Sequence, residues 1–370
     1  MPANTQDFLD FAQTAERVAF TVKRLEKASA LGEYFALLDD ANLKIAARYF
    51  SGRIFSLRDG RTTSIGSAAL LNSVAAVTEI DTNEMRTRLV ILGDFGDVTG
   101  EVLASRKDAP QTSGWTLQNL NEAFEELAST SGSKKKVELV IQILKRAHEL
   151  EAKYIVKLLG GDLRIGLQEG AVEDAIARAA STPVAKVQWA NMLLGDIGET
   201  AVLARHEKLD SAQMKLFHPL KFMLASPAAD LSEVAKQMPE AFAVEDKFDG
   251  IRAQAHLQKI NSEALADNEL HGEVLQGCRV ALFSRTLNEI THSFPDLMPS
   301  LITLLDTNDS LILDGEIVPV NLDDETGRVL PFQQLQKRLG RKALNDEILN
   351  AVPVAFIAYD ILFEGGKILL

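Results

Sequence analysis

Apolar residues in the first 205 positions recur at intervals of three and four, the spacing that places them on one face of a helix. Periodic runs of this kind begin at Phe8, Val18, Leu31 and Lys135, and the last extends to Leu159. Ser131-Gly132-Ser133 supplies a start signal for that run, and Gly160-Gly161 supplies a stop signal. A further helix is predicted for 172–180, ending before Pro183. We therefore predict an all-α amino-terminal domain, 1–208.

The pattern changes after a connector predicted at 209–226. The apolar run 241–245 predicts one strand, and the alternation of apolar and polar residues in 251–257 predicts another, with a short turn between them. A short apolar run, 310–313, predicts another buried strand. The remainder, 227–370, is therefore predicted to be an α+β domain. The whole chain is a multidomain protein with an α domain followed by an α+β domain.

The composition fits a cytoplasmic multidomain protein. The chain has 370 residues, 46% of them hydrophobic, which is enough for two or three domains with their own cores. Its single cysteine, Cys278, excludes a disulfide scaffold and suits a reducing compartment. The amino terminus lacks a basic n-region, and no apolar run reaches about 18 residues. We expect neither a secretory signal nor a membrane partner.

The net charge of −13 gives no simple sign of a nucleic-acid-binding protein. Residues 1–210 carry 25 Lys and Arg against 29 Asp and Glu, and 211–370 carry 14 against 23. Neither part is a basic module, so any contact with nucleic acid must come from local clusters. The six histidines are scattered without metal-ligand spacing.

The clearest chemical signal is Glu245-Asp246-Lys247-Phe248-Asp249-Gly250-Ile251-Arg252. A lysine between a strand and a turn is well placed to act as a nucleophile, provided that desolvation or nearby cations make its amine neutral. Arg252 is such a cation, Asp249 could orient the amine, and Gly250 would let the backbone approach a ligand closely. The alternative is a hairpin turn with exposed charges, because Asp-Gly is a common turn dipeptide.

Further segments in the same order make the chain resemble the ATP-dependent DNA ligase family. Lys-x-Asp-Gly-x-Arg resembles the adenylation motif that these ligases share with RNA ligases and mRNA capping enzymes. Similar to later motifs of that superfamily are 283–291, 313–318 and 358–362, and 331–342 resembles a segment typical of DNA ligases. The resemblance implies a nucleotidyltransferase domain of ATP-grasp-like type, an antiparallel sheet with helices.

The resemblance also implies roles for individual residues. Lys247 would attack the α-phosphate of ATP, with Asp249 and Arg252 completing the catalytic set. The implied ATP-binding residues are Glu245, Lys247, Arg252, Arg285, Glu316 and Tyr359. The arginines would grip phosphate, Tyr359 would stack on adenine, and Glu316 would hold the ribose or Mg²⁺. Without the resemblance, Glu316 indicates only a solvated strand end, and Tyr359 indicates core packing.

The amino-terminal half carries a resemblance of its own. The segments 91–98, 151–159 and 162–167 are similar to parts of the helical DNA-binding domain of archaeal and eukaryotic ligases. In that family the Leu-Arg-x-Gly-Leu loop lies against the minor groove, where backbone amides could bind phosphates. The implied DNA contacts are Arg164, Gly166, Lys134, Lys135, Arg338 and Arg341. Taken alone, these positions indicate a helix-to-helix turn and solvated cations.

The resemblance implies an enzyme that adenylates a lysine, passes AMP to the 5′-phosphate at a nick in duplex DNA, and joins that phosphate to the 3′-hydroxyl. ATP and Mg²⁺ are the implied cofactors and nicked DNA the implied partner, with a nucleoid-associated cytoplasmic location. The sequence stops soon after Leu362, before the later family motifs and the OB fold, so we expect a truncated adenylation domain that would not complete ligation alone.

Three alternatives stay open. RNA ligases and capping enzymes share the lysine motif, but they do not usually carry some 200 helical residues upstream. A noncatalytic DNA-binding remnant is the second alternative. NAD-dependent ligases also share the motif, but they usually have zinc-binding cysteines, and the chain has one cysteine.

Overall fold

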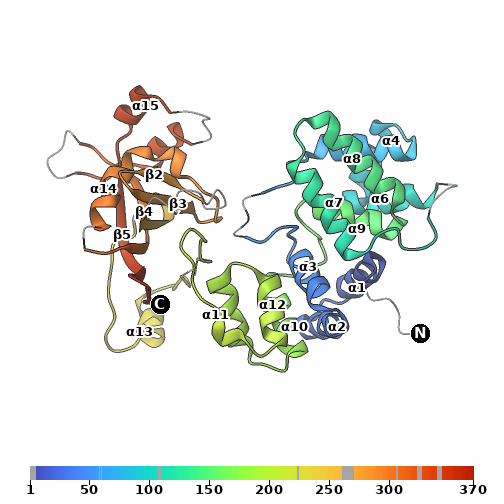
Figure 1. Cartoon of the computed structure of the whole chain (residues 1–370), viewed down its shortest axis with the longest axis horizontal. Helices are drawn as coiled ribbons and strands as arrows, with labels where there is room; N and C mark the ends of the chain where they lie inside the picture. Colours follow the sequence, from blue (N-terminus) through green and yellow to red (C-terminus); the bar gives the residue numbers. More distant parts are fainter. Residues whose placement is uncertain are drawn as a thin grey trace. The chain divides into compact units, whose positions relative to one another are not determined.

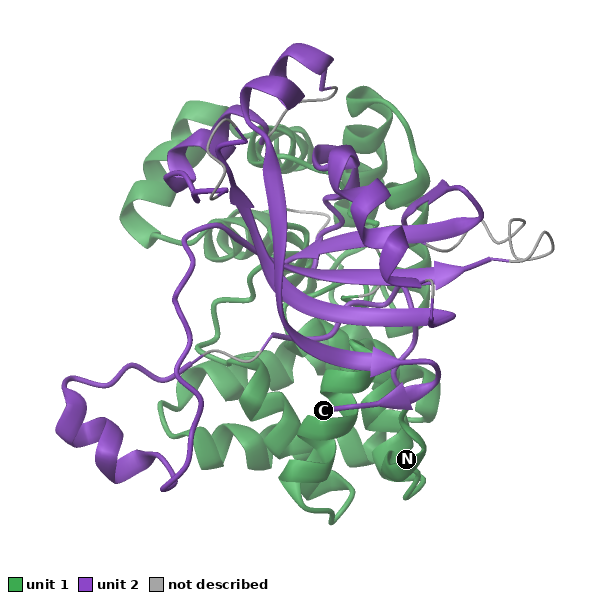
Figure 2. Ribbon diagram, turned by 90° about the vertical axis from the view of Figure 1, so that its left-hand side faces the viewer, with its two compact units in different colours: residues 1–213 green, residues 214–370 purple. Residues whose placement is uncertain are grey.

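The computed structural model describes residues 6–57, 59, 61–106, 110–222, 225–260, 271–305, 307–322, 327–339 and 344–370. The chain divides into two compact units, Met1–Gln213 and Met214–Leu370 (Figure 2). The first unit is helical and the second is built on a β-sheet. The predicted order, an α domain followed by an α+β domain, is confirmed. The division falls inside the segment predicted as a connector.

The first unit consists of helices packed around a shared core (Figure 1). Their bounds are α1 Phe8–Phe20, α2 Arg24–Leu37, α3 Asp40–Phe50, α4 Ser67–Thr78, α5 Thr82–Leu92, α6 Phe95–Ala104, α7 Leu117–Ser129, α8 Ser133–Arg146, α9 Glu149–Leu159, α10 Glu169–Ala179, α11 Val184–Leu194 and α12 Ile197–Arg205. Several begin at an aspartate whose side chain accepts a hydrogen bond from an amide of the first turn, which satisfies a donor that the helix leaves unpaired.

Aromatic side chains join three of these helices. The rings of Phe8 and Phe11 on α1 stack with their centroids 5.0 Å apart. Phe11 also lies edge-on to Tyr49 of α3 and to Tyr154 of α9, at 5.8 and 6.4 Å. All four residues are fully buried. Because edge-to-face pairs favour one geometry, this cluster fixes α9 and the loop that follows it against the rest of the unit.

The periodic run predicted from 135 to 159 is two helices, α8 and α9. The backbone is extended at Ala147 (φ −77°, ψ 138°), which ends α8. His148 then begins α9 with a capping box, in which Glu151 accepts a hydrogen bond from the His148 amide at 2.9 Å. Apolar spacing alone could not reveal this break, because Ala147 is buried and continues the pattern.

Two other helix boundaries differ from the predicted runs. The run that begins at Val18 is divided, because α1 ends at Phe20 and α2 begins at Arg24, with Thr21 extended between them. The helix predicted at 172–180 begins earlier, at Glu169. None of the helices in the described parts of the chain is long and apolar enough to cross a membrane.

The second unit contains one antiparallel sheet with the strand order β2-β3-β1-β4-β5-β6. The strands are β1 Ile251–Lys259, β2 Glu273–Leu275, β3 Cys278–Ser284, β4 Ser310–Pro319, β5 Val354–Glu364 and β6 Lys367–Ile368, and the α-helices are α13 Leu231–Gln237, α14 Met298–Ile302 and α15 Asp346–Ala351. The strand predicted at 310–313 continues to Pro319, so Glu316 lies within β4 and not at its end.

The two faces of the sheet are covered differently. On one face, Ala253, Ala255 and Leu257 of β1 join the main apolar core together with α14. On the other face, the segment after the division of the chain binds β1 through its backbone: Leu220 exchanges two hydrogen bonds with the Gln254 side chain, and the Phe217 amide donates to His256 Nδ1 at 3.0 Å. Burial, with His218 and His271 nearby, lowers the pKa of His256 to about 3, so its ring nitrogen stays free to accept.

The strand predicted at 241–245 is not formed. Residues 242–249 run extended without pairing to another strand in the described parts of the chain, and Phe242 and Val244 are 47% and 85% exposed. Helix α13, just before them, has no buried residue and stands apart from the sheet in both views (Figures 1 and 2). A short apolar run favours a strand, but a strand also needs a neighbour for its backbone hydrogen bonds.

The insertion predicted at 261–277 is only partly visible. Residues 261–270 lie outside the described residues, while β2 and β3 form a short hairpin through the turn at Gln276 and Gly277.

Candidate functional site

Three neighbouring strands bring three of the predicted site residues into one row. Arg252 on β1 pairs in register with Glu316 on β4. On the other side of β1, Ala253 pairs with Ser284, the last residue of β3, and Arg285 begins the turn that follows. Arg285 is exposed on this turn and makes no ion pair with any described residue. The register therefore places Arg252 and Glu316 side by side on one face of the sheet, with Arg285 one residue beyond the last pair of β3.

Arg252 is held by a carboxylate that the sequence did not single out. Its Nε and Nη2 lie 3.3 and 2.7 Å from the two oxygens of Asp314, also on β4, and this paired contact raises the pKa of Arg252. The guanidinium also lies over the Phe222 ring, 4.7 Å from its centroid. Arg252 thus has a fixed orientation before any ligand arrives.

Tyr359 owes its position to a β-bulge. Asp314 pairs with Asp360 and Gly315 with Ala358, so Tyr359 is the extra residue between them on β5. Its ring centroid lies 5.9 Å from the Arg252 guanidinium, and the side chain is 39% exposed. Burial, with Asp314 close by, raises the pKa of Tyr359 to about 12, so the hydroxyl stays protonated at neutral pH. An aromatic ring with an open face is suited to stacking on a base.

Glu316 connects the lysine motif to the sheet. Its Oε1 accepts a hydrogen bond from the Gly250 amide at 3.2 Å. Burial raises the pKa of Glu316, and the Gly250 bond and the charges of Arg252 and Lys247 only partly oppose this. Gly250 must be glycine, because a Cβ there would lie 2.3 Å from the Ile317 carbonyl oxygen. The turn after Lys247 is therefore pressed directly against β4.

The remaining residues of the lysine motif are less constrained. Glu245, Lys247 and Asp249 are all exposed on the extended segment that precedes β1. Among the described residues, no hydrogen bond joins Asp249 to Lys247, so the predicted orienting contact is not formed here. The structure places Lys247 near enough for its charge to act on Glu316.

The described residues contain no cluster of three or more potential metal ligands. Asp314, which Arg252 engages, and Glu316 lie on this face of the sheet, and Asp249 is near enough for its charge to act on Glu316. Mg²⁺ in nucleotide-dependent enzymes is usually held by one or two carboxylates together with substrate phosphates, so Glu316 fits such a role without further protein ligands.

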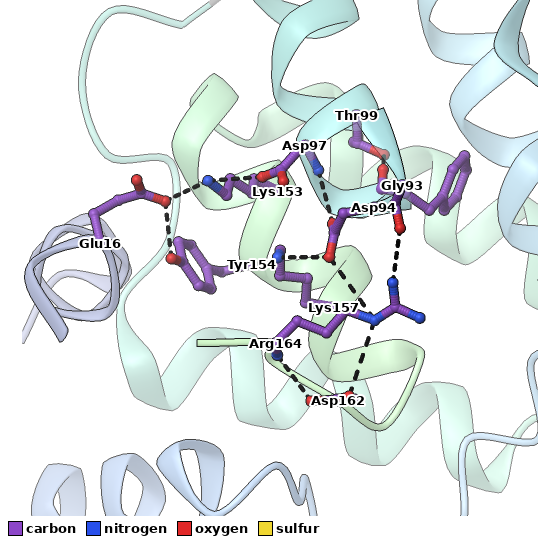
Figure 3. A network of polar contacts seen from close by, with 11 residues as sticks. Glu16, Gly93, Asp94, Asp97, Thr99, Lys153, Tyr154, Lys157, Asp162 and Arg164 are labelled. Carbon is purple, nitrogen blue, oxygen red and sulfur yellow. Dashed lines mark hydrogen bonds and ion pairs between the residues drawn. The ribbon is translucent and has the colours of Figure 1, made fainter. Parts of the chain in front are cut away.

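A second candidate site lies in the first unit, where a polar network joins α1, α6 and α9 (Figure 3). Asp94 begins α6 by accepting from the Asp97 amide at 3.0 Å, and the same carboxylate pairs with the buried Lys157 of α9 at 2.9 Å. Lys153 bridges Asp97 to Glu16 of α1. Burial acts to raise the pKa of Asp94, but the bonds from Lys157 and Asp97 outweigh it and lower the pKa overall.

The predicted DNA-contacting loop is attached to this network (Figure 3). Arg164 Nη1 donates to the Gly93 carbonyl at 2.8 Å, and the side chain remains 59% exposed. Both Arg164 and Gly166 have left-handed backbone conformations, with φ of 51° and 59°. A hollow of about 650 Å³ lies beside Arg164, with Arg86, Asp94 and Lys157 also in its lining. The two segments that resemble ligase DNA-binding elements, 91–98 and 162–167, therefore meet in space.

The sequence contains a signal for the role of Lys157. It interrupts the apolar run Ile155-Val156-Lys157-Leu158-Leu159, and a charge in such a run needs a buried partner. Asp94 was present in the resembling segment, but nothing in the sequence showed that the two residues meet. The contact joins positions 63 residues apart.

The other residues predicted to contact DNA differ in their exposure to solvent. Lys134 and Lys135 are exposed in the first turn of α8. Arg338 is fully buried: its guanidinium forks onto Asp296 at 2.7 and 2.8 Å and also donates to the Val352 carbonyl. We therefore assign Arg338 a structural role in place of the predicted DNA contact. Arg341 lies outside the described residues.

Comparisons with known proteins agree with this arrangement. Residues 7–177 match the family described as DNA ligase N terminus, and residues 271–370 match the ATP dependent DNA ligase domain. The chain is 40% identical to a probable DNA ligase of Koribacter versatilis over 97% of its own length. It is 33% identical to a probable DNA ligase of Opitutus terrae and 30% identical to a DNA ligase of Methanothermobacter thermautotrophicus, each over 98% of its length.

The chain spans 58%, 40% and 62% of the lengths of these three relatives. The two family matches cover the helical unit and most of the sheet, in the order found along the chain. The chain therefore belongs to the ATP-dependent DNA ligase family.

Proposed function

We propose that the protein containing this chain is an ATP-dependent DNA ligase that adenylates Lys247 and seals nicks in duplex DNA. The observation that carries the proposal is that residues from three separate sequence motifs meet on one face of the sheet. Gly250 bonds to Glu316, and Arg252 lies beside Glu316 in register and near Tyr359. A catalytic reading predicts this convergence, whereas an ordinary Asp-Gly turn would not require it.

In the first step, the Lys247 amine would attack the α-phosphorus of ATP. A nitrogen–phosphorus bond forms, the bond from that phosphorus to the bridging oxygen breaks, and pyrophosphate leaves with the electron pair. Arg252, already oriented by Asp314, and the exposed Arg285 would offset the charge on the phosphates. Tyr359 would stack on the adenine, and Glu245 would lie beside the base.

Glu316 would contact the ribose or hold Mg²⁺ against the phosphates. When bound, Mg²⁺ would neutralise charge that develops on the phosphate oxygens. Asp249 would orient the amine of Lys247.

The second and third steps act on DNA. AMP would pass from Lys247 to the 5′-phosphate at the nick, and the 3′-hydroxyl would then attack that phosphate and release AMP. We propose that Arg164 and Gly166, with Lys134 and Lys135, contact the backbone of the duplex without reading its sequence. These residues belong to the unit that matches the DNA ligase N terminus, which favours DNA over RNA as the substrate.

The first test is transfer of label from α-³²P-ATP in the presence of Mg²⁺, with mass spectrometry to locate the AMP. We would assay the 370-residue chain and the longest form of the protein that the cell makes. Lys247→Ala should abolish the adduct, whereas Lys236→Ala, which removes an exposed lysine of α13, should not. Absence of AMP on Lys247 in both forms would contradict the proposal.

A second test separates DNA from RNA substrates. The adenylated protein would be offered nicked duplex DNA and the same nick within duplex RNA. We expect the 5′-adenylated product on DNA. A clear preference for RNA would favour an RNA ligase activity instead.

A further inference from the structure

Lys27 of α2 has an unusual environment for a lysine. Lys27 is only 6% exposed, and its ammonium donates to the carbonyl oxygens of Ile165 and Gly166 at 2.6 and 2.9 Å. Burial lowers the pKa of Lys27. These two bonds link α2 to the loop between α9 and α10, 138 and 139 residues further along the chain.

The bonds to Lys27 determine which way the loop amides face. In a trans peptide the N–H points opposite to the C=O of the same unit. Since the carbonyls of Ile165 and Gly166 point at Lys27, the N–H groups of Gly166 and Leu167 point away from it. Neither amide donates to an acceptor within the described parts of the chain, and Gly166 is exposed. Lys27 therefore turns two adjacent donors outward.

The charge around Lys27 is not balanced. Lys27 forms no ion pair with a carboxylate among the residues that the structure describes, although a buried ammonium normally requires one. It lines a hollow of about 480 Å³ that also has Arg24, Arg164 and Gly166 in its wall. Of these two arginines, Arg24 pairs with Asp174, which is outside the lining. The wall also contains the carboxylate of Asp162, which is 71% exposed and lies 3.9 Å from the Arg164 guanidinium.

We propose that Lys27 is a positioning residue for the 164–167 loop, and that the hollow it lines receives one backbone phosphate of the duplex. A phosphodiester would accept from the amides that Lys27 turns outward, and its negative charge would lie in a hollow that Lys27 and Arg164 both line. The proposal rests on the DNA-ligase function proposed above and adds to it a residue that neither the motif nor the loop sequence contains.

The test compares the affinity of the 370-residue chain for a nicked duplex at several salt concentrations. Lys27→Met keeps the length of the side chain and removes its donors and charge. Lys23→Met is the matched control, because Lys23 carries the same charge just before α2 but is exposed and pairs with Glu26. We expect Lys27→Met to bind on the order of tenfold more weakly, with a slope of log K against log salt reduced by about one. Lys23→Met should keep the wild-type slope.

A second arm changes the DNA. Neutral methylphosphonates would replace the phosphates of the duplex one at a time. Replacing one particular phosphate should weaken binding by the wild type but should weaken binding by Lys27→Met only slightly. The variant has already lost the contact with that phosphate. If Lys27→Met melts below the assay temperature, Arg24→Gln and Arg164→Gln, on the exposed rim of the same hollow, should show the reduced slope and the same insensitive position.

The outcomes separate this inference from the proposed function. Wild-type protein that fails to bind duplex DNA would contradict the DNA-binding function itself. Wild-type binding with equal slopes for Lys27→Met and Lys23→Met, and no methylphosphonate position that distinguishes them, would overturn the inference alone. A stability loss in Lys27→Met without a change in slope would mean that Lys27 only supports the fold.

Discussion

At the scale of single residues, the candidate active site depends on contacts too close to tolerate substitution. Gly250 is the clearest case, because its backbone lies against β4 where a methyl group would meet the Ile317 carbonyl at 2.3 Å. The turn therefore sets the distance between Lys247, on one side of Gly250, and Arg252, on the other.

Gly250→Ala should lower self-adenylation by about 100-fold, because a displacement of roughly 1 Å between nucleophile and phosphate has an effect of that size. The free energy of unfolding should fall by about 1–3 kcal/mol. Gly66→Ala is the control, since no atom lies within 4 Å of a Cβ there and its φ of −83° suits any residue. Adenylation and denaturant unfolding check both effects, and equal activity of the two variants would refute the close-contact argument.

Asp94 gives a prediction about pH. Its pKa is lowered in the folded protein, so its pair with Lys157 contributes stability above the ordinary carboxyl pKa of about 4, and this contribution is lost as the pH falls through the lowered value. Asp94→Asn should cost on the order of 3 kcal/mol at neutral pH.

The difference in unfolding free energy between wild type and Asp94→Asn should shrink as the pH is lowered below about 4. Chemical denaturation of both proteins between neutral and acidic pH measures this difference. A difference that stays constant over that range would show that the pair with Lys157 does not lower the pKa of Asp94.

At the scale of elements, the sequence predicted helices and strands better than their ends. The run 135–159 has continuous apolar spacing, but a buried alanine and a capping box divide it in two. The apolar segment 241–245 was predicted to be a strand and forms none, because an apolar run does not specify a pairing partner. The segments that contain Asp314 and Asp94 could be identified from the sequence, but the partners of these two residues and of Lys27 are distant positions that no local pattern indicates.

Arg338 is another residue whose distant contact could not be predicted from the local sequence. The sequence predicted that it contacts DNA. Its buried fork to Asp296 joins the 3-10 turn Phe332–Lys337 to the segment before α14. Arg338→Met should lower the free energy of unfolding by about 3 kcal/mol, because Asp296 would lose its partner. The salt dependence of DNA binding should stay unchanged.

The neighbouring exposed Lys337 provides the control. Lys337→Met should change stability by less than about 0.5 kcal/mol. Thermal unfolding and DNA titration of both variants separate the two roles. A reduced salt slope in Arg338→Met, measured well below its melting temperature, would restore the predicted DNA contact.

At the scale of the whole molecule, each unit has its own core and its own candidate site. The aromatic cluster and the network around Asp94 lie entirely within 1–213. We therefore expect residues 1–213 to fold alone and to bind nicked duplex DNA with the salt dependence of the whole chain, but to take no label from ATP. Circular dichroism and DNA titration test this, and a fragment without cooperative melting would refute it.

The exposed, extended stretch 242–249 has a practical consequence. Proteases bind substrates in this conformation, and trypsin cuts after a free lysine, so the bond between Lys247 and Phe248 should be among the first to be cleaved. An AMP group on Lys247 would remove the charge that trypsin recognises. The resistance of this one peptide bond would then count the molecules that carry the adenylate, without any radioactive label.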